Sequence, residues 1–268
     1  MIGTELVELL IKDNDNVVTL ADLKDGYDLT DYETCKFLCE DIDEVYHLVG
    51  GKGSPRMTNL KPLDFMFPML QCDTNMIRAA IECKVKKFLY TSSIAVLNPQ
   101  TDKYPAWAKM TGETLLEATK IQYPWFKSVV VRPSNCYGKF DNFSNINAMV
   151  ITSLINNAFN NDVIEVWGDG SEIRDFVNAK DVAKGMIKAM DVMPDRAINL
   201  CSGKETTIKE VVEAIQCCFV AKGAHYNPTQ SSGDKKRVMI TNGDLIGWKA
   251  EINIEDGIKE VIEYYAKR

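Results

Sequence analysis

The sequence predicts an α/β protein built on a parallel sheet. In the first half, short apolar runs typical of buried strands alternate with longer segments of helical periodicity. The β-branched run at 128–131 ends in Arg132-Pro133, and proline is suited to the end of a strand. The second half is less regular, which indicates a smaller α/β lobe that follows a regular sheet domain.

Each element of the first half is assigned from its residue pattern. Amphipathic spacing predicts helices, and apolar or β-branched runs predict buried strands. The expected order is helix 4–12, strand 16–20, helix 32–39, strand 44–49, helix 72–83, strand 87–91, helix 106–121 and strand 128–131.

Helix signals are clearer than strand signals in the second half. Thr207 and Glu210 form a capping box that opens a helix over 208–220, and Asn253 caps a final helix that ends near Tyr265. The other expected elements are helix 145–157, strand 164–167, helix 181–190 and strand 197–200.

Composition limits the classes of partner. The chain has 268 residues, 46% of them hydrophobic and 26% charged, as is ordinary for a soluble globular protein. A net charge of −7 argues against nucleic acid or an anionic membrane as the main partner. Eight cysteines without a CxxC pair, and two histidines, give no metal-site pattern. With no signal peptide or membrane-length apolar run, the scattered cysteines predict a cytoplasmic protein with reduced thiols.

The segment 87–96 and the helix start that follows it carry the most chemical information. An apolar β-run ends in Thr91-Ser92-Ser93, and Lys109 lies near the start of the next helix. This arrangement can place a serine hydroxyl and an ammonium around one carbonyl or alcohol, as hydride-transfer chemistry requires. The segment resembles the catalytic segment of the extended short-chain dehydrogenase/reductases, in particular the NAD-dependent nucleotide-sugar epimerases and dehydratases.

The resemblance implies roles for residues of that segment. Ser93 would hydrogen-bond the reacting sugar oxygen, and Lys109 would contact the nicotinamide ribose and lower the pKa of a neighbouring tyrosine. The family's tyrosine position is Pro105 here, which has no acidic proton. Tyr104 is one residue too early, and Pro105 is expected to hold it extended, from where its hydroxyl could reach the site. The structural alternatives are a serine that caps a strand end and a surface pair between Lys109 and Glu113.

The resemblance also implies a Rossmann-like, doubly wound parallel sheet, here with its first strand missing. Gly3 matches the last glycine of the family's phosphate-binding turn, and the first strand and earlier glycines are absent before it. Because that strand is central in the family's sheet, its loss is expected to split the sheet or to force re-pairing. The alternative explanation is a truncated or misassigned start of the gene product.

A nicotinamide dinucleotide is the implied cofactor. Asp22 follows the expected strand 16–20, where a carboxylate would hydrogen-bond the adenosine ribose and favour NAD over NADP. Asp28 and Leu29 resemble the pair that lies against the adenine, and Val49-Gly50 resembles the turn beside the dinucleotide. A solvated loop aspartate is the structural alternative for Asp22.

Four residues of the second half are implied to bind a nucleotide sugar. Asn135, in Arg-Pro-Ser-Asn-Cys-Tyr-Gly, would hold the diphosphate region, and Trp167 would line the site. Arg174 would grip phosphate through its forked guanidinium, and Arg237 would contact the nucleotide. A salt bridge from Arg174 to a nearby aspartate, and a solvated charge run around Arg237, are the alternatives.

The pattern Tyr-Gly-x-x-Asp-Asn-Phe at 137–143 is most similar to the GDP-fucose synthase-like members of the family. Two proton-transfer positions of those enzymes, a histidine and a cysteine, correspond to Met149 and Ala95, so epimerisation by that pair is not expected. Met69 or Leu70 stands where relatives have a cofactor-site asparagine.

The resemblance as a whole implies an NAD-dependent epimerase, dehydratase or reductase that acts on a GDP- or other NDP-sugar by transient hydride transfer at a sugar carbon. The alternative is a catalytically impaired member that serves as a nucleotide-sugar binding or assembly module. Residues 1–138, with 177–201 returning to them, are expected to bind NAD, and 139–176 with 202–268 the nucleotide sugar. A homodimer through helices 72–83 and 106–121 is also expected.

Overall fold

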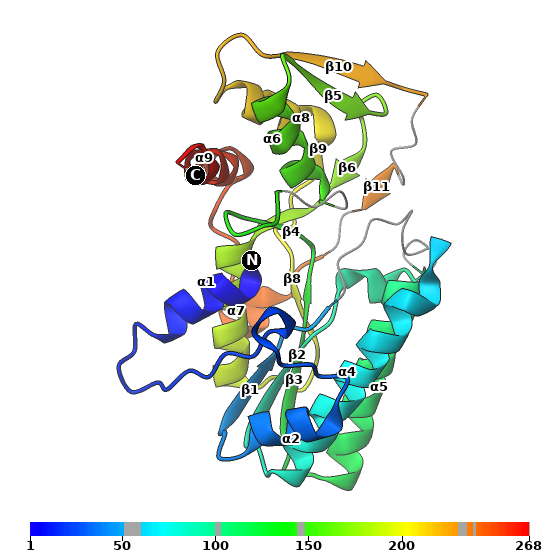
Figure 1. Ribbon diagram of the computed structural model, residues 1–268, viewed down its shortest axis with the longest axis vertical. Helices are drawn as coiled ribbons and strands as arrows, with labels where there is room; N and C mark the ends of the chain where they lie inside the picture. The colour runs from blue at the N-terminus through cyan, green and yellow to red at the C-terminus, as the bar shows by residue number, and fades with distance from the viewer. Residues whose placement is uncertain (51–59, 100–102, 144–147, 230–234, 238–239, 268) are drawn as a thin grey trace.

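A parallel sheet with helices on both faces forms the lower lobe of the molecule, and a smaller α/β lobe lies above it (Figure 1). The computed structural model describes residues 1–50, 60–99, 103–143, 148–229, 235–237 and 240–267. The predicted α/β class is therefore confirmed.

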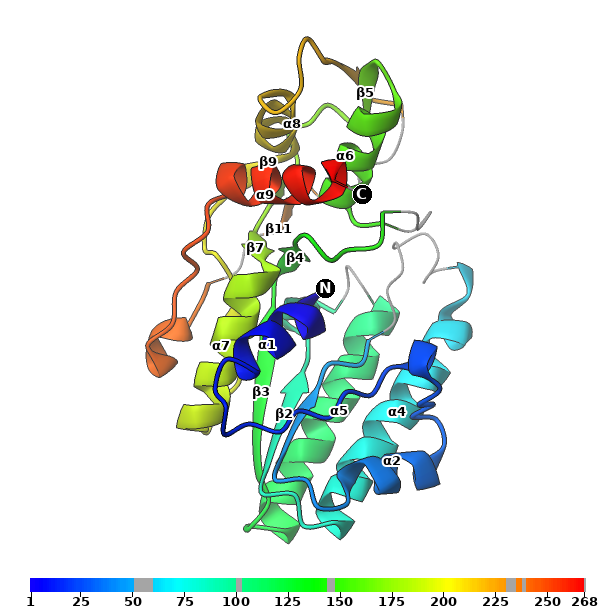
Figure 2. The same ribbon diagram turned by 60° about the vertical axis from the view of Figure 1, so that its left-hand side comes forward.

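The sheet has the strand order β1-β2-β3-β8, and its neighbouring strands are parallel. Helices α1 and α7 pack side by side on one face, around a core that includes Leu89 and Val131. Helices α2, α4 and α5 cover the other face around Phe88 and Tyr90 (Figure 2). The lower lobe contains α1 (Ile2–Leu10), α2 (Tyr32–Cys39), β1 (Glu44–His47), α4 (Pro62–Glu82), β2 (Lys87–Thr91), α5 (Lys103–Gln122), β3 (Lys127–Pro133), α7 (Ala179–Val192) and β8 (Ile198–Leu200), with the 3-10 turns η1 (Leu23–Asp25), η2 (Ile94–Leu97) and η3 (Gly243–Ile246).

The strand expected at 16–20 is wrong. This segment is irregular, and its apolar side chains face solvent, with Val17 95% exposed. A strand needs a hydrogen-bonding neighbour, and among the described residues no strand pairs with β1 on the side away from β2. The sheet thus ends at β1, and it is neither split nor re-paired as expected from the missing first strand.

Several helix bounds differ from the predicted ones. Helix α4 begins at Pro62, well before residue 72, and accommodates Pro68 in its interior. The expected helix 145–157 runs instead over α6 (Val150–Asn160), and the helix expected to reach residue 220 ends earlier, as α8 (Ile208–Gln216). The Thr207–Glu210 capping box is confirmed. In the part of the chain that the structure describes, no helix combines the length and apolar character needed to cross a bilayer.

The upper lobe has its own apolar core, built from α6, α8 and α9 and the buried side of β5, including Ile155, Ile164, Val211 and Val261. Lys139 joins the lobes at their junction, since its Nζ lies 3.7 Å from Glu5 of α1 and 3.6 Å from Glu260 of α9. The elements of this lobe are β4 (Asn135–Tyr137), α6, β5 (Val163–Trp167), β6 (Ile173–Arg174), β7 (Phe176–Asn178), β9 (Thr206–Thr207), α8, β10 (Gly223–Asn227), β11 (Lys236–Arg237) and α9 (Ile254–Ala266).

Candidate functional site

Polar groups gather where β1, β2 and β3 end, at the carboxyl edge of the sheet. Val49 follows β1, Ser92 and Ser93 follow β2, and Ser134 and Asn135 follow β3. In open parallel α/β sheets, ligands bind at this edge because the loops diverge there. The sheet topology therefore brings the sequence-predicted Val49, Ser93 and Asn135 to one edge of the molecule.

Lys109 is the buried cation of this edge. It lies in the first half of α5, and its side chain is 8% exposed. Its Nζ donates a hydrogen bond of 2.7 Å to the backbone carbonyl of Val49 and lies 3.7 Å from Oδ2 of Asp73. Burial lowers the pKa of Lys109, and the Asp73 carboxylate opposes this effect.

The alternative pairing of Lys109 with Glu113 is not what the structure contains. Glu113 is held by Arg132 in a two-pronged contact, with Nε–Oε1 at 2.8 Å and Nη2–Oε2 at 2.5 Å. Four residues along a helix bring side chains close, but a guanidinium from β3 offers Glu113 two hydrogen bonds at once.

Local hydrogen bonds satisfy only part of the hydroxyl cluster at the end of β2. Ser93 caps η2, where its Oγ accepts from the backbone N–H of Ala95 at 3.2 Å, so the proposed strand-end cap is present. The hydroxyl proton of Ser93 is still available for a ligand. Thr91 Oγ1 and Ser92 Oγ are buried and have no hydrogen-bond partner among the described residues. Buried unpaired hydroxyls are costly, and the described residues do not offset this cost.

The expectation for Tyr104 is wrong in one respect. Tyr104 is the second residue of α5, so it is helical and not extended. Pro105 lies in the first turn of the helix, where its missing N–H removes no helical hydrogen bond. Lys103, one residue before Tyr104, places its ammonium 5.5 Å from the Tyr104 ring. Along a helix, Tyr104 lies about 100° around the axis from the position of Pro105.

The residues expected near the adenosine end make local contacts. Asp22 caps η1 by accepting from the N–H of Lys24 at 3.1 Å, and Asp28 accepts from the N–H and hydroxyl of Thr30. These hydrogen bonds lower the pKa of Asp28. Leu29 packs against the core under α2, while Gly3 lies in the first turn of α1, with open space beside its Cα. Gly50 is likewise exposed and open, and Gly51 lies outside the described residues.

Asp175 fixes the position of Asn135. Its backbone carbonyl accepts from the Asn135 side-chain amide at 2.9 Å. Its fully buried carboxylate accepts from the hydroxyl of Ser134, from the N–H and hydroxyl of Ser202 and from the N–H of Gly203, at 2.8–2.9 Å. One aspartate therefore ties the ends of β3 and β8 to the strand segment that carries Arg174.

The other predicted nucleotide-sugar residues lie in the upper lobe. Arg174, in β6, donates from Nη1 to the carbonyl of Ile173 at 2.9 Å. Its strand pairs in parallel with β11, where Arg237 is the register partner of Arg174; for Arg237 only the backbone is described. Trp167 ends β5 and is 59% exposed. The segment 230–234 before β11 lies outside the described residues.

Ala95 and Met149 offer no proton-transfer group where they lie. Ala95 is part of η2, and Met149 precedes α6 as its N-cap residue without a side-chain cap. Met69, on α4, is buried.

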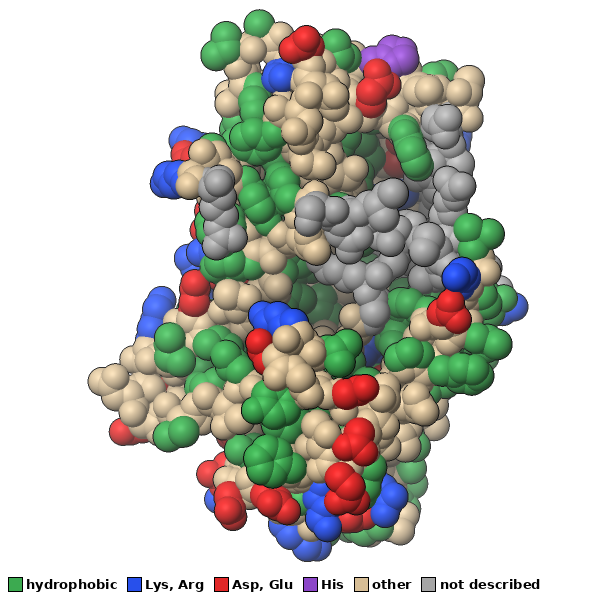
Figure 3. Space-filling view, viewed as in Figure 1, with side chains coloured by type: hydrophobic (Ala, Val, Ile, Leu, Met, Phe, Trp, Pro, Cys, Tyr) green, Lys and Arg blue, Asp and Glu red, His purple; other side chains and the backbone are tan. Residues whose placement is uncertain are grey.

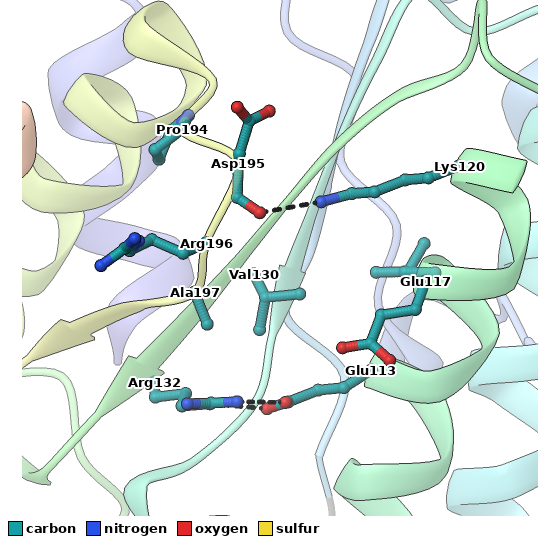
Figure 4. A pocket seen from close by; sticks show the side chains of 10 residues that line it. Glu113, Glu117, Lys120, Val130, Arg132, Pro194, Asp195, Arg196 and Ala197 are labelled. Carbon is teal, nitrogen blue, oxygen red and sulfur yellow. Dashed lines mark hydrogen bonds and ion pairs between the residues drawn. The ribbon is translucent and has the colours of Figure 1, made fainter.

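A cavity of about 480 Å³ lies away from this edge, between α5, β3 and the loop 194–197 (Figure 4). The Arg132–Glu113 contact forms one end of it, and Lys120 reaches across to the carbonyl of Asp195 at 3.2 Å. None of the predicted site residues lines this cavity.

Comparison with known proteins identifies the family. The model of the NAD dependent epimerase/dehydratase family matches residues 1–201. The chain belongs to this family. The resemblance stated from the sequence is thereby confirmed.

Curated relatives include GDP-L-fucose synthases. The enzyme of Escherichia coli strain K12 is 27% identical over an alignment of 295 positions that covers 97% of this chain and 88% of that protein. GDP-L-fucose synthase 1 of Arabidopsis thaliana is 28% identical over 240 residues, covering 80% and 74%.

Solved structures share the fold. The UDP-glucose 4-epimerase of Thermotoga maritima, solved with UDP-glucose, superposes with a TM-score of 0.85 at 21% identity, covering 100% of this chain and 96% of that one. A GDP-mannoheptose C4 reductase of Campylobacter jejuni, solved with NADP bound, gives 0.84 at 22% identity, covering 99% and 95%. The predicted Rossmann-like class is therefore confirmed.

Asp73 and His47 were not predicted from the sequence. Asp73 lies in the middle of α4 between Cys72 and Met76, both buried. A lone carboxylate on the apolar face of a helix is a usable sequence signal, because it must find a buried partner. Its partners come from three other elements and could not be assigned from spacing.

We predict that Asp175→Asn lowers the free energy of unfolding by about 2–3 kcal/mol, because the amide group turns a donor toward the donors of Ser202 and Gly203. Urea denaturation measures the change. Asp169→Asn is the control, since Asp169 is an exposed loop residue that also accepts from a serine, and it should change stability by less than about 1 kcal/mol. Equal effects of the two substitutions would contradict this role of Asp175.

Proposed function

We propose that the protein binds a nicotinamide dinucleotide and a nucleotide sugar, and that it acts as an epimerase, dehydratase or reductase on a GDP- or other NDP-sugar. The main support is a buried ammonium, that of Lys109, at the carboxyl edge of a parallel sheet, where the Ser93 hydroxyl keeps its proton for a ligand. The family and its GDP-sugar relatives point the same way.

In this proposal each residue has a defined task. Ser93 donates its hydroxyl proton in a hydrogen bond to the reacting sugar oxygen, and Lys109 holds the nicotinamide ribose beside Val49 and Gly50. Asn135 and Arg174 bind the diphosphate, while Trp167 and Arg237 bind the nucleotide part. When bound, the dinucleotide supplies the hydride acceptor or donor.

The finer assignments belong to the same proposal. Asp22, Asp28, Leu29 and Gly3 bind the adenosine diphosphate end, and the carboxylate of Asp22 favours NAD over NADP. Residues 1–138 with 177–201 bind the dinucleotide, and 139–176 with 202–268 bind the sugar nucleotide. All eight cysteines are free thiols, which supports a reducing compartment such as the cytoplasm.

A second function is supported by one observation, the proline at position 105. With Tyr104 turned around the helix from that position, the described site has no acidic hydroxyl four residues before Lys109. A member without this group would serve as a nucleotide-sugar binding or assembly module. Binding is common to both functions, and turnover separates them.

Ligand binding tests the shared part of the proposal. Titration calorimetry with NADH, NADPH, GDP-L-fucose and UDP-glucose should detect one dinucleotide and one nucleotide sugar. Lys109→Met should weaken dinucleotide binding by about tenfold or more, because a charged hydrogen bond to the ribose is lost. Lys120→Met is the matched control, since Lys120 lies on the same helix but lines the cavity between α5, β3 and the loop 194–197. A well-folded protein that binds none of these ligands would falsify the proposal.

Turnover is tested by Pro105→Tyr, which restores a phenol in the first turn of α5. A general acid or base contributes about 10²–10⁴-fold, so turnover of GDP- and UDP-sugars should rise by at least 10²-fold. Pro105→Phe is the control, because it adds the ring without the hydroxyl. If Pro105→Tyr is folded, binds both ligands and still shows no turnover, the binding-module function is favoured.

We also propose a homodimer that pairs α4 and α5 of two copies. Large apolar side chains are exposed along these helices: Leu63, Phe67, Trp107 and Ile121. Figure 3 shows the part of this surface over the N-terminal half of α4, at the right-hand edge. Large exposed apolar side chains on two neighbouring helices support an interface there.

Phe67→Glu should weaken the dimer at least tenfold in sedimentation velocity experiments, because it buries a charge in the interface. Val192→Glu removes an apolar side chain of similar exposure at the end of α7, and it should leave association unchanged. A wild-type protein that stays monomeric at all concentrations would contradict the dimer.

A further inference from the structure

Asp73 is the centre of a buried polar cluster that spans four elements. Its side chain is 2% exposed and comes from α4. Oδ1 lies 2.8 Å from Nε2 of His47 at the end of β1, and Oδ2 accepts a hydrogen bond of 2.5 Å from the hydroxyl of Tyr90 in β2. Lys109 of α5 places its ammonium 3.7 Å from the same Oδ2.

The cluster keeps Asp73 in its ionised form. Burial alone would raise the pKa of Asp73, but the hydrogen bonds from His47 and Tyr90 and the charge of Lys109 outweigh burial, and the pKa is lowered. A carboxylate only accepts hydrogen bonds, so Nε2 of His47 carries a proton in this contact. Asp73 is thus a fixed negative charge in the core.

Lys109 depends on this charge. Its ammonium lies over the Tyr90 ring at 4.7 Å and donates to the Val49 carbonyl, and neither neighbour carries a negative charge. Glu113, one helical turn along α5, is committed to Arg132. The titratable and charged groups that act on Lys109 are Asp73 and Cys72 of α4, Glu113 of α5, Tyr90 of β2 and, through Asp73, His47 of β1.

Packing alone does not account for the cluster. A buried ion pair is seldom more stable than apolar residues of the same volume, because desolvation of both charges offsets their attraction. Yet the fold makes room for it, since a Cβ on Gly112 would lie 2.2 Å from the Tyr90 hydroxyl. Only glycine at this position of α5 leaves space for the hydroxyl that binds Asp73.

We propose that Asp73 is a positioning residue, whose carboxylate holds the Lys109 ammonium charged and directed at the Val49 carbonyl, beside the ribose of a bound nicotinamide dinucleotide. This inference rests on the proposed function for the identity of the ligand. The inference extends the proposed function because it assigns the group that sets the charge and orientation of Lys109.

The test uses Asp73→Asn in the full chain, with lysines labelled with ¹³C and the Lys109 signal assigned by Lys109→Arg. An opposite charge at this distance typically moves a pKa by about 1–3 units, so the titration midpoint of Lys109 should fall by at least about 1 unit. Dinucleotide affinity of Asp73→Asn should then fall with rising pH at least about 1 pH unit earlier than that of the wild type.

Tyr90→Phe is the matched control. It removes one hydrogen bond from Asp73 and disturbs the same core, but it keeps both charges, so the Lys109 midpoint should stay near the wild-type value. If both variants shift Lys109 equally, or if folded Asp73→Asn shifts neither the midpoint nor the affinity, Asp73 is a structural residue and the inference is overturned.

A second measurement tests the inference if Asp73→Asn does not fold. In Lys109→Met the Asp73 carboxyl loses its cation, and its ¹³C-detected pKa should rise; an unchanged value overturns the inference. Wild-type protein that binds neither NADH nor NADPH would instead overturn the proposed function and the ribose contact with it. Binding with an uncoupled Lys109 would overturn the role of Asp73 alone.

Discussion

One buried carboxylate, that of Asp73, sets the arrangement of the lower lobe around the site. A charge in the core must be matched by hydrogen bonds and an opposite charge, and here each partner comes from a different element: His47 from β1, Tyr90 from β2 and Lys109 from α5. The two strands and two helices are therefore fixed relative to one another at the level where the sheet ends.

Buried carboxylates also bind several donors at the junction of the lobes. Asp175 gathers donors from the ends of β3 and β8. Asp181, at the start of α7, accepts from the N–H groups of Glu251 and Ile252 and so binds the segment before α9. Loops carry many unpaired N–H groups, and a buried carboxylate satisfies several of them at once. The mutual position of the two lobes thus depends on a few buried aspartates.

Local patterns in the sequence were sufficient for most of the sheet and its helices. The apolar runs at 44–49, 87–91 and 128–131 became β1, β2 and β3. Helices with readable periodicity cover both faces of the sheet, although β1, at its edge, is only partly buried. The run at 16–20 has the same local character but is no strand, since strand formation depends on a neighbour that the local sequence does not specify.

The candidate site was likewise predictable from local sequence only in part. The family motif located Ser93 and Lys109, and both lie at the carboxyl edge of the sheet. The partner of Lys109 was not predicted, because Asp73 lies 36 positions earlier in sequence and meets the lysine only through packing of α4 on α5. Helical geometry favoured Glu113 instead, and a guanidinium from β3 competes for that carboxylate. Tyr104 was expected to be extended because proline restricts the residue before it, yet the helix extends through both.

The place of β8 in the sheet has a consequence for how the chain folds. β8 pairs with β3, but all of the elements from β4 to α7 lie between them in sequence. Strands β1, β2 and β3 can assemble through single helical crossovers, whereas β8 can join only after a long excursion of chain has been ordered. The entropy cost of closing this loop must be met before the β3–β8 contacts form, and this slows the step. During synthesis, the edge of β3 is therefore expected to stay unpaired until the elements from β4 to α7 have been made and β8 can pair with it.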